Sequence, residues 1–374
     1  MADKLRVGII GGGQLGQMLG FAGRELNIDC EFLDPAAEPP AAEAGPVVRA
    51  AFEDREAVLE LARRVDALTY EFENVPVDAL EPAGEVCPVF PPLDALRAAQ
   101  DRLAEKRLFE ALGIPLPGWH AVSSRGDLDA AATALGLPFV VKTRRFGYDG
   151  KGQFVVRETD DLDRAWKALG DVPLIAEQWV AFDRELSAIG VRGVNGETVC
   201  YPLTENLHAG GILRYSRAPA DSGALEAMAR DYLTRLLDEL DYVGVIALEL
   251  FAVGDQLLAN EFAPRVHNSG HWTIEGADPS QFANHLLAVT GREPRTPALR
   301  GHAGMINLIG EIPGPARALD RPYATLHDYG KSPRPGRKLG HITVLTDAAA
   351  SRDRGLLAIG ETVTGLAPEF GTRE

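Results

Sequence analysis

The stretch "VGVIALELFAVGDQLLANEFAPR", residues 243–265, has two apolar runs separated by a short turn-like segment, and it predicts a β-hairpin. Glu249 interrupts the first run and Glu261 lies on the second, although burying a lone carboxylate is costly unless a cation or hydrogen bonds compensate it. A three-residue turn at 254–256 would place Glu249 opposite Glu261, whereas a two-residue turn would place it opposite Asn260. Two carboxylates in such close contact repel each other unless a divalent cation lies between them.

Upstream, "VVKTRRFGYDGKGQFVV" at residues 140–156 predicts two strands joined by a glycine-rich loop. Lys142 lies near the end of the first strand, and the loop glycines permit close backbone approach to nucleotide phosphates. The segment is not a Walker A loop, because G-x-x-x-x-G-K-[ST] occurs nowhere in the chain. For this segment alone, a surface hairpin with solvated cations is an equally good interpretation.

The next segment, "PLIAEQWVAFDREL" at residues 173–186, predicts an apolar strand that ends near Glu177. A strand end presents backbone N–H and C=O groups to an adenine edge, and Glu185 shortly afterwards can accept ribose hydroxyls. Two exposed acids around a turn are the alternative. Because oxygen ligands beside a phosphate-binding loop suit Mg²⁺, we favour metal–nucleotide binding over a chance pair of acids in the hairpin.

Polar side chains crowd into "APRVHNSGHWTIEG", residues 263–276, whose Asn-Ser-Gly sequence opposes a regular helix. Two zinc-binding histidines four residues apart would need such a helix, so we favour a substrate-contacting loop. The polar members are Arg265, His267, Asn268 and His271.

A second polar segment, "YGKSPRPGRKLGH" at residues 329–341, is basic in an otherwise acidic protein. Such clusters are usually solvated, but the glycines and prolines imply a shaped loop that one phosphate monoester would satisfy. Its members are Lys331, Arg334, Arg337, Lys338 and His341.

The N-terminal "VGIIGGGQLGQMLG", residues 7–20, has the glycine spacing of a dinucleotide-binding turn after a buried strand. Asp34 follows a second apolar run, about where such folds keep a ribose-binding carboxylate. The motif is weak evidence for NAD, because a turn at a helix N-terminus suits any phosphate. An NAD-dependent oxidoreductase is one alternative, and it leaves the glutamate hairpin and the glycine loop unexplained.

Composition restricts the class of protein. Of the 374 residues, 45% are hydrophobic and 25% charged, which is typical of a soluble globular protein with two or three domains. The net charge of −16 argues against nonspecific binding to nucleic acid or anionic membrane. Three widely separated cysteines suggest neither a disulfide framework nor a cysteine metal site, so a reducing cytoplasm fits. No signal peptide or membrane-spanning run is expected, since no apolar stretch reaches about 18 residues.

Apolar runs alternate with helix-like segments over residues 1–92, which predicts βαβ units and a parallel sheet. The prolines of "PVFPPLDAL" break this pattern, so we place a domain boundary near residue 92 and expect Asp94 to cap the following helix. That helix should continue to Gly113, with Arg102 and Lys106 on one face.

Taken together, Lys142, the loop at 147–153, "EQWV" and the hairpin acids resemble the ATP-grasp fold, in which two α+β subdomains hold ATP between them. A more specific resemblance is to the N5-carboxyaminoimidazole ribonucleotide synthetase family, ATP-dependent carboxylases of purine biosynthesis. Its segments "GGGQLGQML", "YEFENVP", "GYDGKGQ", "PLTENLHAGGIL", "NEFAPRVHNSGHWT", "MINLIG" and "RPGRKLGHIT" occur here in order. The implied architecture is mixed α/β and α+β. It has a Rossmann-like parallel-sheet domain at 1–92, an ATP-grasp domain at 93–300 divided near 180, and a small β-rich domain at 301–374.

The resemblance implies roles for individual residues. Those expected to contact ATP are Arg102, Lys142, Gly147, Tyr148, Asp149, Gly150, Lys151, Gly152, Gln153, Glu177, Gln178, Trp179, Val180, Glu185, His208, Asn260 and Glu261. Those expected to contact the ribonucleotide are Gln14, Tyr148, Asp149, Arg265, His267, Asn268, Lys331, Arg337 and Lys338, the last three at its 5′-phosphate. Glu249 and Glu261 should hold Mg²⁺. The amides of the N-terminal turn should border the ribose-phosphate, Glu73 and Asn74 are assigned only to the substrate side, and the role of Lys106 is left open.

The implied reaction joins bicarbonate to the exocyclic amine of 5-aminoimidazole ribonucleotide, with cleavage of ATP to ADP and phosphate. Bicarbonate is a poor electrophile, so phosphorylation to carboxyphosphate would create a leaving group, while Mg²⁺ and Lys142 offset charge on the transferring phosphoryl group. Arg265 and His267 should hold bicarbonate, and Asp149 should orient the amine or accept its proton. The resemblance also suggests a cytoplasmic homodimer with small-molecule substrates.

Two further alternatives stay open beside the oxidoreductase. An ATP-grasp ligase for another phosphorylated purine precursor would share the nucleotide residues and differ at 265–271 and 331–341. A catalytically silent nucleotide-binding protein is opposed by the intact acids of the hairpin.

Overall fold

The computed structural model describes residues 4–147, 150–312, 314 and 321–370. The N-terminal elements are β1 (Leu5–Ile10), α1 (Gln14–Glu25), β2 (Ile28–Leu33), β3 (Val47–Val48), α2 (Arg55–Ala62), β4 (Ala67–Tyr70) and α3 (Val77–Leu80). Their strands form a parallel sheet in the order β3-β2-β1-β4, as the alternation of apolar runs and helices predicted. Gly16 lets α1 approach the turn closely, since a Cβ there would lie 2.8 Å from the carbonyl oxygen of Gly11.

The single helix predicted from residue 94 to Gly113 is two helices, α4 (Leu93–Ala99) and α5 (Arg102–Ala111). Asp94 was wrongly expected to be a cap: it lies in the first turn of α4, where it pairs with Arg97 at 2.6 Å. Asp101 caps α5 instead, and its carboxylate accepts the Leu103 N–H at 2.9 Å. The break therefore places Arg102 in the first turn of a new helix.

A small antiparallel sheet follows, in the order β5-β8-β6-β7. Its elements are β5 (Trp119–Val122), α6 (Arg125–Leu135), β6 (Phe139–Thr143), β7 (Gln153–Val156), α7 (Asp161–Leu169) and β8 (Leu174–Gln178). Apolar side chains from the sheet and its two helices, such as Leu128, Phe139 and Ala165, are completely buried between them. The predicted strand pair around the glycine loop is thereby confirmed as β6 and β7.

A nine-stranded antiparallel sheet forms the centre of the molecule, in the order β14-β13-β9-β11-β12-β17-β19-β18 with β10 on β9. Its strands are β9 (Arg184–Arg192), β10 (Thr198–Cys200), β11 (Thr204–Ala209), β12 (Ile212–Ala218), β13 (Gly244–Val253), β14 (Gln256–Ala263), β17 (His302–Ile309), β18 (Ala324–Asp328) and β19 (Lys338–Thr346). The remaining elements are α8 (Leu225–Glu239), α9 (Thr273–Gly276), β15 (Ala277–Asp278), α10 (Gln281–Val289), β16 (Ala298–Leu299) and α12 (Ala349–Thr364). Strands from the predicted 301–374 domain thus continue the large sheet, and the domain boundaries stay predictions.

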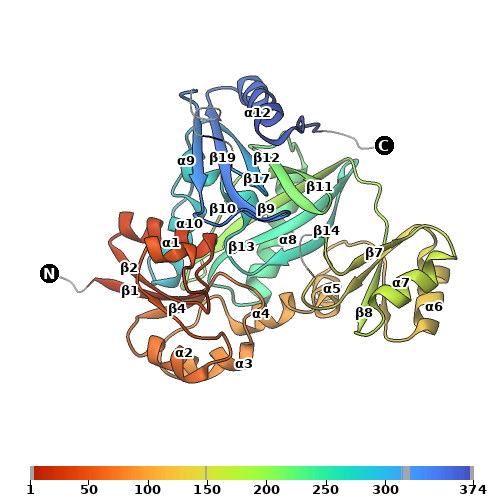
Figure 1. Cartoon of the computed structure of the whole chain (residues 1–374), viewed down its shortest axis with the longest axis horizontal. Helices are drawn as coiled ribbons and strands as arrows, with labels where there is room; N and C mark the ends of the chain where they lie inside the picture. The colour runs from red at the N-terminus through yellow and green to blue at the C-terminus, as the bar shows by residue number, and fades with distance from the viewer. Residues whose placement is uncertain (1–3, 148–149, 313, 315–320, 371–374) are drawn as a thin grey trace.

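Figure 1 shows the large sheet with the N-terminal sheet on one side and the small sheet on the other, while α4 and α5 run between these two. The N-terminal part packs firmly on the centre, because Leu19 of α1 and Leu286 of α10 are completely buried in one apolar core. The N-terminal part and the large sheet therefore share one apolar core.

The glutamate hairpin has the predicted pairing for a different reason. Its turn contains two residues, because Val253 pairs with Gln256, and such a turn alone would place Glu249 opposite Asn260. A β-bulge between Glu249 and Leu250 shifts the register by one, so Glu249 pairs with Glu261. The sequence left the length of the turn open: the structure has the two-residue turn, and the juxtaposition of the two acids, which only the three-residue alternative gave, arises from the bulge instead.

Candidate functional site

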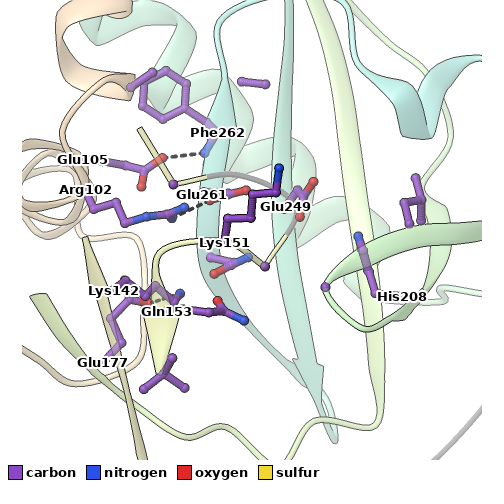
Figure 2. Close-up of a pocket in the computed structure, with 18 of the residues that line it drawn as sticks. Arg102, Glu105, Lys142, Lys151, Gln153, Glu177, His208, Glu249, Glu261 and Phe262 are labelled. Atoms are coloured by element: carbon purple, nitrogen blue, oxygen red, sulfur yellow. Dashed lines mark hydrogen bonds and ion pairs between the residues drawn. The ribbon is translucent and has the colours of Figure 1, made fainter. Parts of the chain in front are cut away.

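A cavity of about 500 Å³ lies where the three sheets meet. Its wall combines residues from the N-terminal part (Gln14, Glu73), the small sheet (Lys142, Glu177) and the large sheet (Glu249). Figure 2 shows its charged side chains converging from α5, the small sheet and the hairpin. Residues predicted from widely separated motifs therefore share one site.

The hairpin carboxylates each have a nitrogen partner in this cavity. Glu261 Oε2 lies 2.6 Å from Arg102 Nη1, and Glu249 Oε1 lies 3.2 Å from His267 Nε2. Burial and the charge of Glu261 raise the pKa of Glu249. Burial acts in the same direction on Glu261, but the charges of Arg102 and Lys142 hold its pKa well below the usual range.

The donor set around the hairpin suits Mg²⁺. Glu249 and Glu261 offer carboxylate oxygens, and the Oδ1 of Asn260 is buried without a hydrogen-bond partner. In the part of the chain that the structure describes, no group of three or more His, Cys, Asp or Glu side chains is arranged to hold a metal ion by itself. Two carboxylates that leave the other positions to substrate phosphates and water match the way proteins bind Mg²⁺.

Three cations surround the carboxylate of Glu177. Its Oε2 lies 2.8 Å from Lys142 Nζ and 3.6 Å from the Nζ of Lys106, which is completely buried. Burial opposes ionisation, but the charges of Lys106, Lys142 and Arg102 lower the pKa of Glu177 to about 2. Burial and the like charges of Arg102 and Lys106 in turn lower the pKa of Lys142. The excess of positive charge favours binding of a polyanion such as a nucleotide triphosphate.

The predicted nucleotide-contacting segment at the end of β8 lines the cavity. Glu177 was predicted to contribute through its backbone, whereas its side chain is the acid at the centre of the cations. Phe182 and Phe251 also line this wall with rings stacked at 4.8 Å, and neither was predicted from the sequence. Their sequence positions could have indicated them, because each lies close to a predicted site acid, Glu185 or Glu249. The predicted members in this wall are Glu177, Gln178, Trp179 and Val180.

Glu185 and His208, both predicted to contact ATP, bind each other here. Glu185 Oε2 lies 3.0 Å from His208 Nδ1. Burial opposes protonation of His208, but its hydrogen bond and ion pair with Glu185 raise its pKa. Both residues line the cavity beside the hairpin strands.

The glycine loop lies over the cavity through Gly147, Gly150, Lys151 and Gln153. Gly150 and Gly152 have φ angles of +75° and +70°, a conformation that side chains other than glycine rarely adopt. Gly152 packs against Thr143 rather than lining the cavity. Tyr148 and Asp149 lie outside the described residues.

On the opposite side, Arg265, His267 and Asn268 line the cavity, as predicted for the substrate loop. Arg265 Nη2 lies 2.7 Å from the carboxylate of Glu73, which gives the "YEFENVP" motif a direct connection to this loop. Burial and the charge of Arg265 lower the pKa of His267 to about 3, so its imidazole is neutral. Asn268 and Asn307 exchange amide hydrogen bonds of 3.1 and 2.6 Å.

The basic loop is divided between the cavity and its rim. Lys338 lines the cavity, whereas Lys331 hydrogen-bonds Gln14 Oε1 and Arg337 donates to Ser332. Burial lowers the pKa of Lys331 to about 8. His341 does not belong to this surface: it is buried in β19 with its Nδ1 2.7 Å from the hydroxyl of Tyr329, because the loop ends where β19 begins.

His271 is a second predicted polar contact that lies elsewhere, since it is completely buried in the core beside Phe282. The stretch that follows His267 forms a short 3₁₀ turn, η3 (Asn268–Gly270), and not the longer helix that two zinc-binding histidines four residues apart would need.

The amides of the N-terminal turn are already bonded within the protein. The Gly12 N–H donates to Asp34 Oδ2 at 2.7 Å, and the Gly13 N–H donates to Glu71 Oε1 at 2.8 Å. The Gly11 N–H donates to the carbonyl of Leu33. In this conformation these amides and the Asp34 carboxylate have partners within the protein, and the expectation that the turn borders a ribose-phosphate stays a prediction.

Three family models match successive parts of the chain. They describe a ribonucleotide synthetase preATP-grasp domain at residues 4–100, an ATP-grasp domain at 107–282, and a phosphoribosylaminoimidazole carboxylase C-terminal domain at 303–354. No helix among the described residues is both long and apolar enough to span a membrane.

Individual relatives resemble the chain over nearly its full length. The N5-carboxyaminoimidazole ribonucleotide synthase of Pseudomonas aeruginosa is 49% identical over 340 residues, which cover 91% of this chain and 94% of that protein. The crystal structure of the Thermus thermophilus synthetase is 50% identical with a TM-score of 0.93, covering 97% of this chain and 100% of the other. The Aspergillus clavatus enzyme in complex with ADP and 5-aminoimidazole ribonucleotide is 32% identical with a TM-score of 0.90, covering 98% and 100%.

Proposed function

The chain belongs to the N5-carboxyaminoimidazole ribonucleotide synthase family of ATP-dependent ligases, and on this premise we propose that it attaches bicarbonate to the exocyclic amine of 5-aminoimidazole ribonucleotide. The products are N5-carboxyaminoimidazole ribonucleotide, ADP and phosphate. One observation carries the proposal: a single cavity brings the hairpin acids and the Lys142 cluster next to Arg265 and His267. Such a cavity has room and charge for a nucleotide and an anionic second substrate together.

ATP is bound between the small and large sheets. The end of β8 receives adenine, and the Glu185–His208 pair receives the ribose. Lys142 and Arg102 meet the phosphates, and the cation excess around Glu177 supports this placement. Positioning and charge stabilisation are what phosphoryl transfer requires of a protein.

Glu249 and Glu261 would hold Mg²⁺, with the unpartnered Oδ1 of Asn260 as a further oxygen nearby. When bound, the metal ion would supply Lewis-acid neutralisation of the phosphate oxygens. Arg102 pairs with Glu261 at 2.6 Å, so its guanidinium lies beside the proposed metal site and available to the phosphates.

Carboxylation takes two displacements. A bicarbonate oxygen attacks the γ-phosphorus, the bond to the β-phosphate oxygen breaks, and ADP leaves. The amine nitrogen then attacks the carbonyl carbon of carboxyphosphate. The bond from this carbon to the oxygen that bridges it to phosphorus breaks, phosphate leaves, and the amine loses one proton. Arg265 stabilises the carboxyl oxygens as an oxyanion donor, and neutral His267 hydrogen-bonds the same anion. Asp149 is proposed to orient the amine or take its proton.

The ribonucleotide lies with its amine beside Arg265 and Asn268 and its 5′-phosphate toward Lys331, Arg337 and Lys338. The contact of Lys331 with Gln14 supports this placement, because it brings the basic loop to the N-terminal turn. A cytoplasmic homodimer is proposed from family membership alone, and analytical ultracentrifugation tests the oligomeric state.

The decisive assay is ADP release from Mg·ATP by the purified protein. We expect release to require both 5-aminoimidazole ribonucleotide and bicarbonate. Release without bicarbonate, or with formate in its place, would contradict the carboxylation, and binding of NADH would favour the oxidoreductase alternative. The variant Arg265→Ala should lose carboxylation, and full activity in this variant would contradict the assigned role.

A further inference from the structure

β14, which carries Glu261, is the end strand of the large sheet, and its outer edge faces α5 and the segment that follows. The Ala259 N–H donates to the carbonyl of Pro115 at 2.7 Å. Lys106 Nζ donates to the carbonyl of Asn260, and the Phe262 N–H donates to Glu105 Oε1 at 2.7 Å. The backbone on both sides of Glu261 is therefore held by side chains of one helix.

These two side chains are buried, which is unusual for an adjacent acid and base. Glu105 is 2% exposed and Lys106 is completely buried. Burial, the largest effect, raises the pKa of Glu105 to about 8. The hydrogen bonds to main-chain groups of β14 compensate the desolvation of these two polar side chains, because burying a polar group is costly unless it is hydrogen-bonded.

The held segment coincides with the β-bulge. Asn260 is the extra residue of β14; if the strands paired without a bulge, the two-residue turn would place Glu249 opposite Asn260 instead of Glu261. A bulge leaves the extra residue out of the strand ladder, so its main-chain groups need other partners. Lys106 provides that partner for the carbonyl of Asn260.

Arg102, Glu105 and Lys106 are spaced three and four residues apart, so all three lie on one side of α5. Figure 2 shows Arg102 reaching Glu261 while Glu105 reaches Phe262 beside it. The helix thus contacts the side chain of residue 261 and the backbone of both neighbours.

We propose that Glu105 and Lys106 are positioning residues for the metal site: they hold the bulge at Asn260 so that Glu261 faces Glu249. This inference rests on the proposed metal role of the two hairpin acids. Each side chain acts through the backbone of β14, which it hydrogen-bonds directly.

The test compares binding of ADP in the presence of Mg²⁺ and in the presence of EDTA, by isothermal titration calorimetry. Glu105→Ala leaves the Phe262 N–H without its acceptor, and we expect about tenfold weaker binding of Mg·ADP, with metal-free ADP changed by less than about twofold. Glu105→Gln keeps the acceptor oxygen and should restore the ratio. Glu110→Ala is the matched control, because this glutamate of α5 is exposed and bonds Trp119 instead of β14.

Glu261→Gln distinguishes failure of the proposed metal role from failure of the positioning role. If this variant keeps the full enhancement by Mg²⁺, the proposed metal role fails. If it loses the enhancement while Glu105→Ala keeps it, the metal role stands and the positioning inference is overturned. An equal loss of both binding modes in Glu105→Ala would show a merely structural role and also overturns the inference. If Glu105→Ala does not fold, Lys106→Met is measured instead. Lys106 also contacts Glu177, but losing that contact changes the affinities for Mg·ADP and for metal-free ADP alike, so its effect cancels in their ratio.

Discussion

Replacing Glu177 with glutamine is expected to lower the free energy of unfolding of the ligand-free protein by about 3 kcal/mol at neutral pH. The buried carboxylate compensates two ammonium groups, that of partly exposed Lys142 at 2.8 Å and that of buried Lys106 at 3.6 Å. Those charges lower its pKa, against the effect of burial, from 4.5 to about 2. The difference, 4.5 − 2, is about 2.5, and at about 1.36 kcal/mol for each pKa unit it corresponds to about 3 kcal/mol.

The same interaction predicts the dependence on pH. Because the folded pKa lies below the unfolded one, the stabilisation is fully present above about pH 4.5 and is lost as the pH falls toward 2. Urea unfolding followed by circular dichroism, between pH 7.5 and pH 3, measures the difference between wild type and Glu177→Gln. Glu158→Gln is the control, since that glutamate is exposed on the same small-sheet unit. Equal stability at pH 7.5, or a difference that does not shrink toward pH 3, would refute the reasoning.

Three further variants test other parts of the site. Arg265→Lys keeps a positive charge but loses the two-pronged donor, and we expect carboxylation to fall about 100-fold while ATP binding, measured by calorimetry, is unchanged. The KM for 5-aminoimidazole ribonucleotide should rise above pH 8, because Lys331 loses its proton at a pKa lowered by burial to about 8; Lys331→Met should abolish this rise, and an unchanged profile would contradict a phosphate contact. Gly152→Ala introduces a Cβ 2.6 Å from the hydroxyl oxygen of Thr143 at a φ of +70°, so we expect a lower melting temperature and a higher KM for ATP, whereas a wild-type melting curve would count against strain at this turn.

The elements that the sequence predicted best are those with a local cause. Apolar runs became strands wherever glycine or proline bounded them, as at β6, β7 and β13. Residues that line the cavity could be predicted because binding of phosphate, metal and carboxylate groups requires charged or polar side chains. Such side chains are conspicuous within apolar runs of the sequence, as Glu249 is.

Other features depend on partners far along the chain. The helix break before Arg102 contains no glycine or proline that would have predicted it. Asp101 is held at the break by Arg144, whose Nε lies 3.0 Å from the Asp101 carboxylate. The central position of Glu177, on β8, requires Lys106, which comes from α5 much earlier in the chain. His341 was misplaced because a basic pattern continued into a strand, although the apolar residues that follow it were the signal for that strand.

The two hairpin glutamates also obey a parity rule. Eleven residues separate Glu249 from Glu261, an odd number, so paired positions can account for only ten of them at most and one residue must be unmatched. The spacing requires a residue without a partner in the ladder, but it does not determine whether this residue lies in the turn or in a strand. In this protein it lies in a strand, at Asn260. Deletion of Asn260 would therefore leave ten residues between the acids, which the four strand pairs and the two-residue turn account for without a bulge, so Glu249 and Glu261 would still face each other.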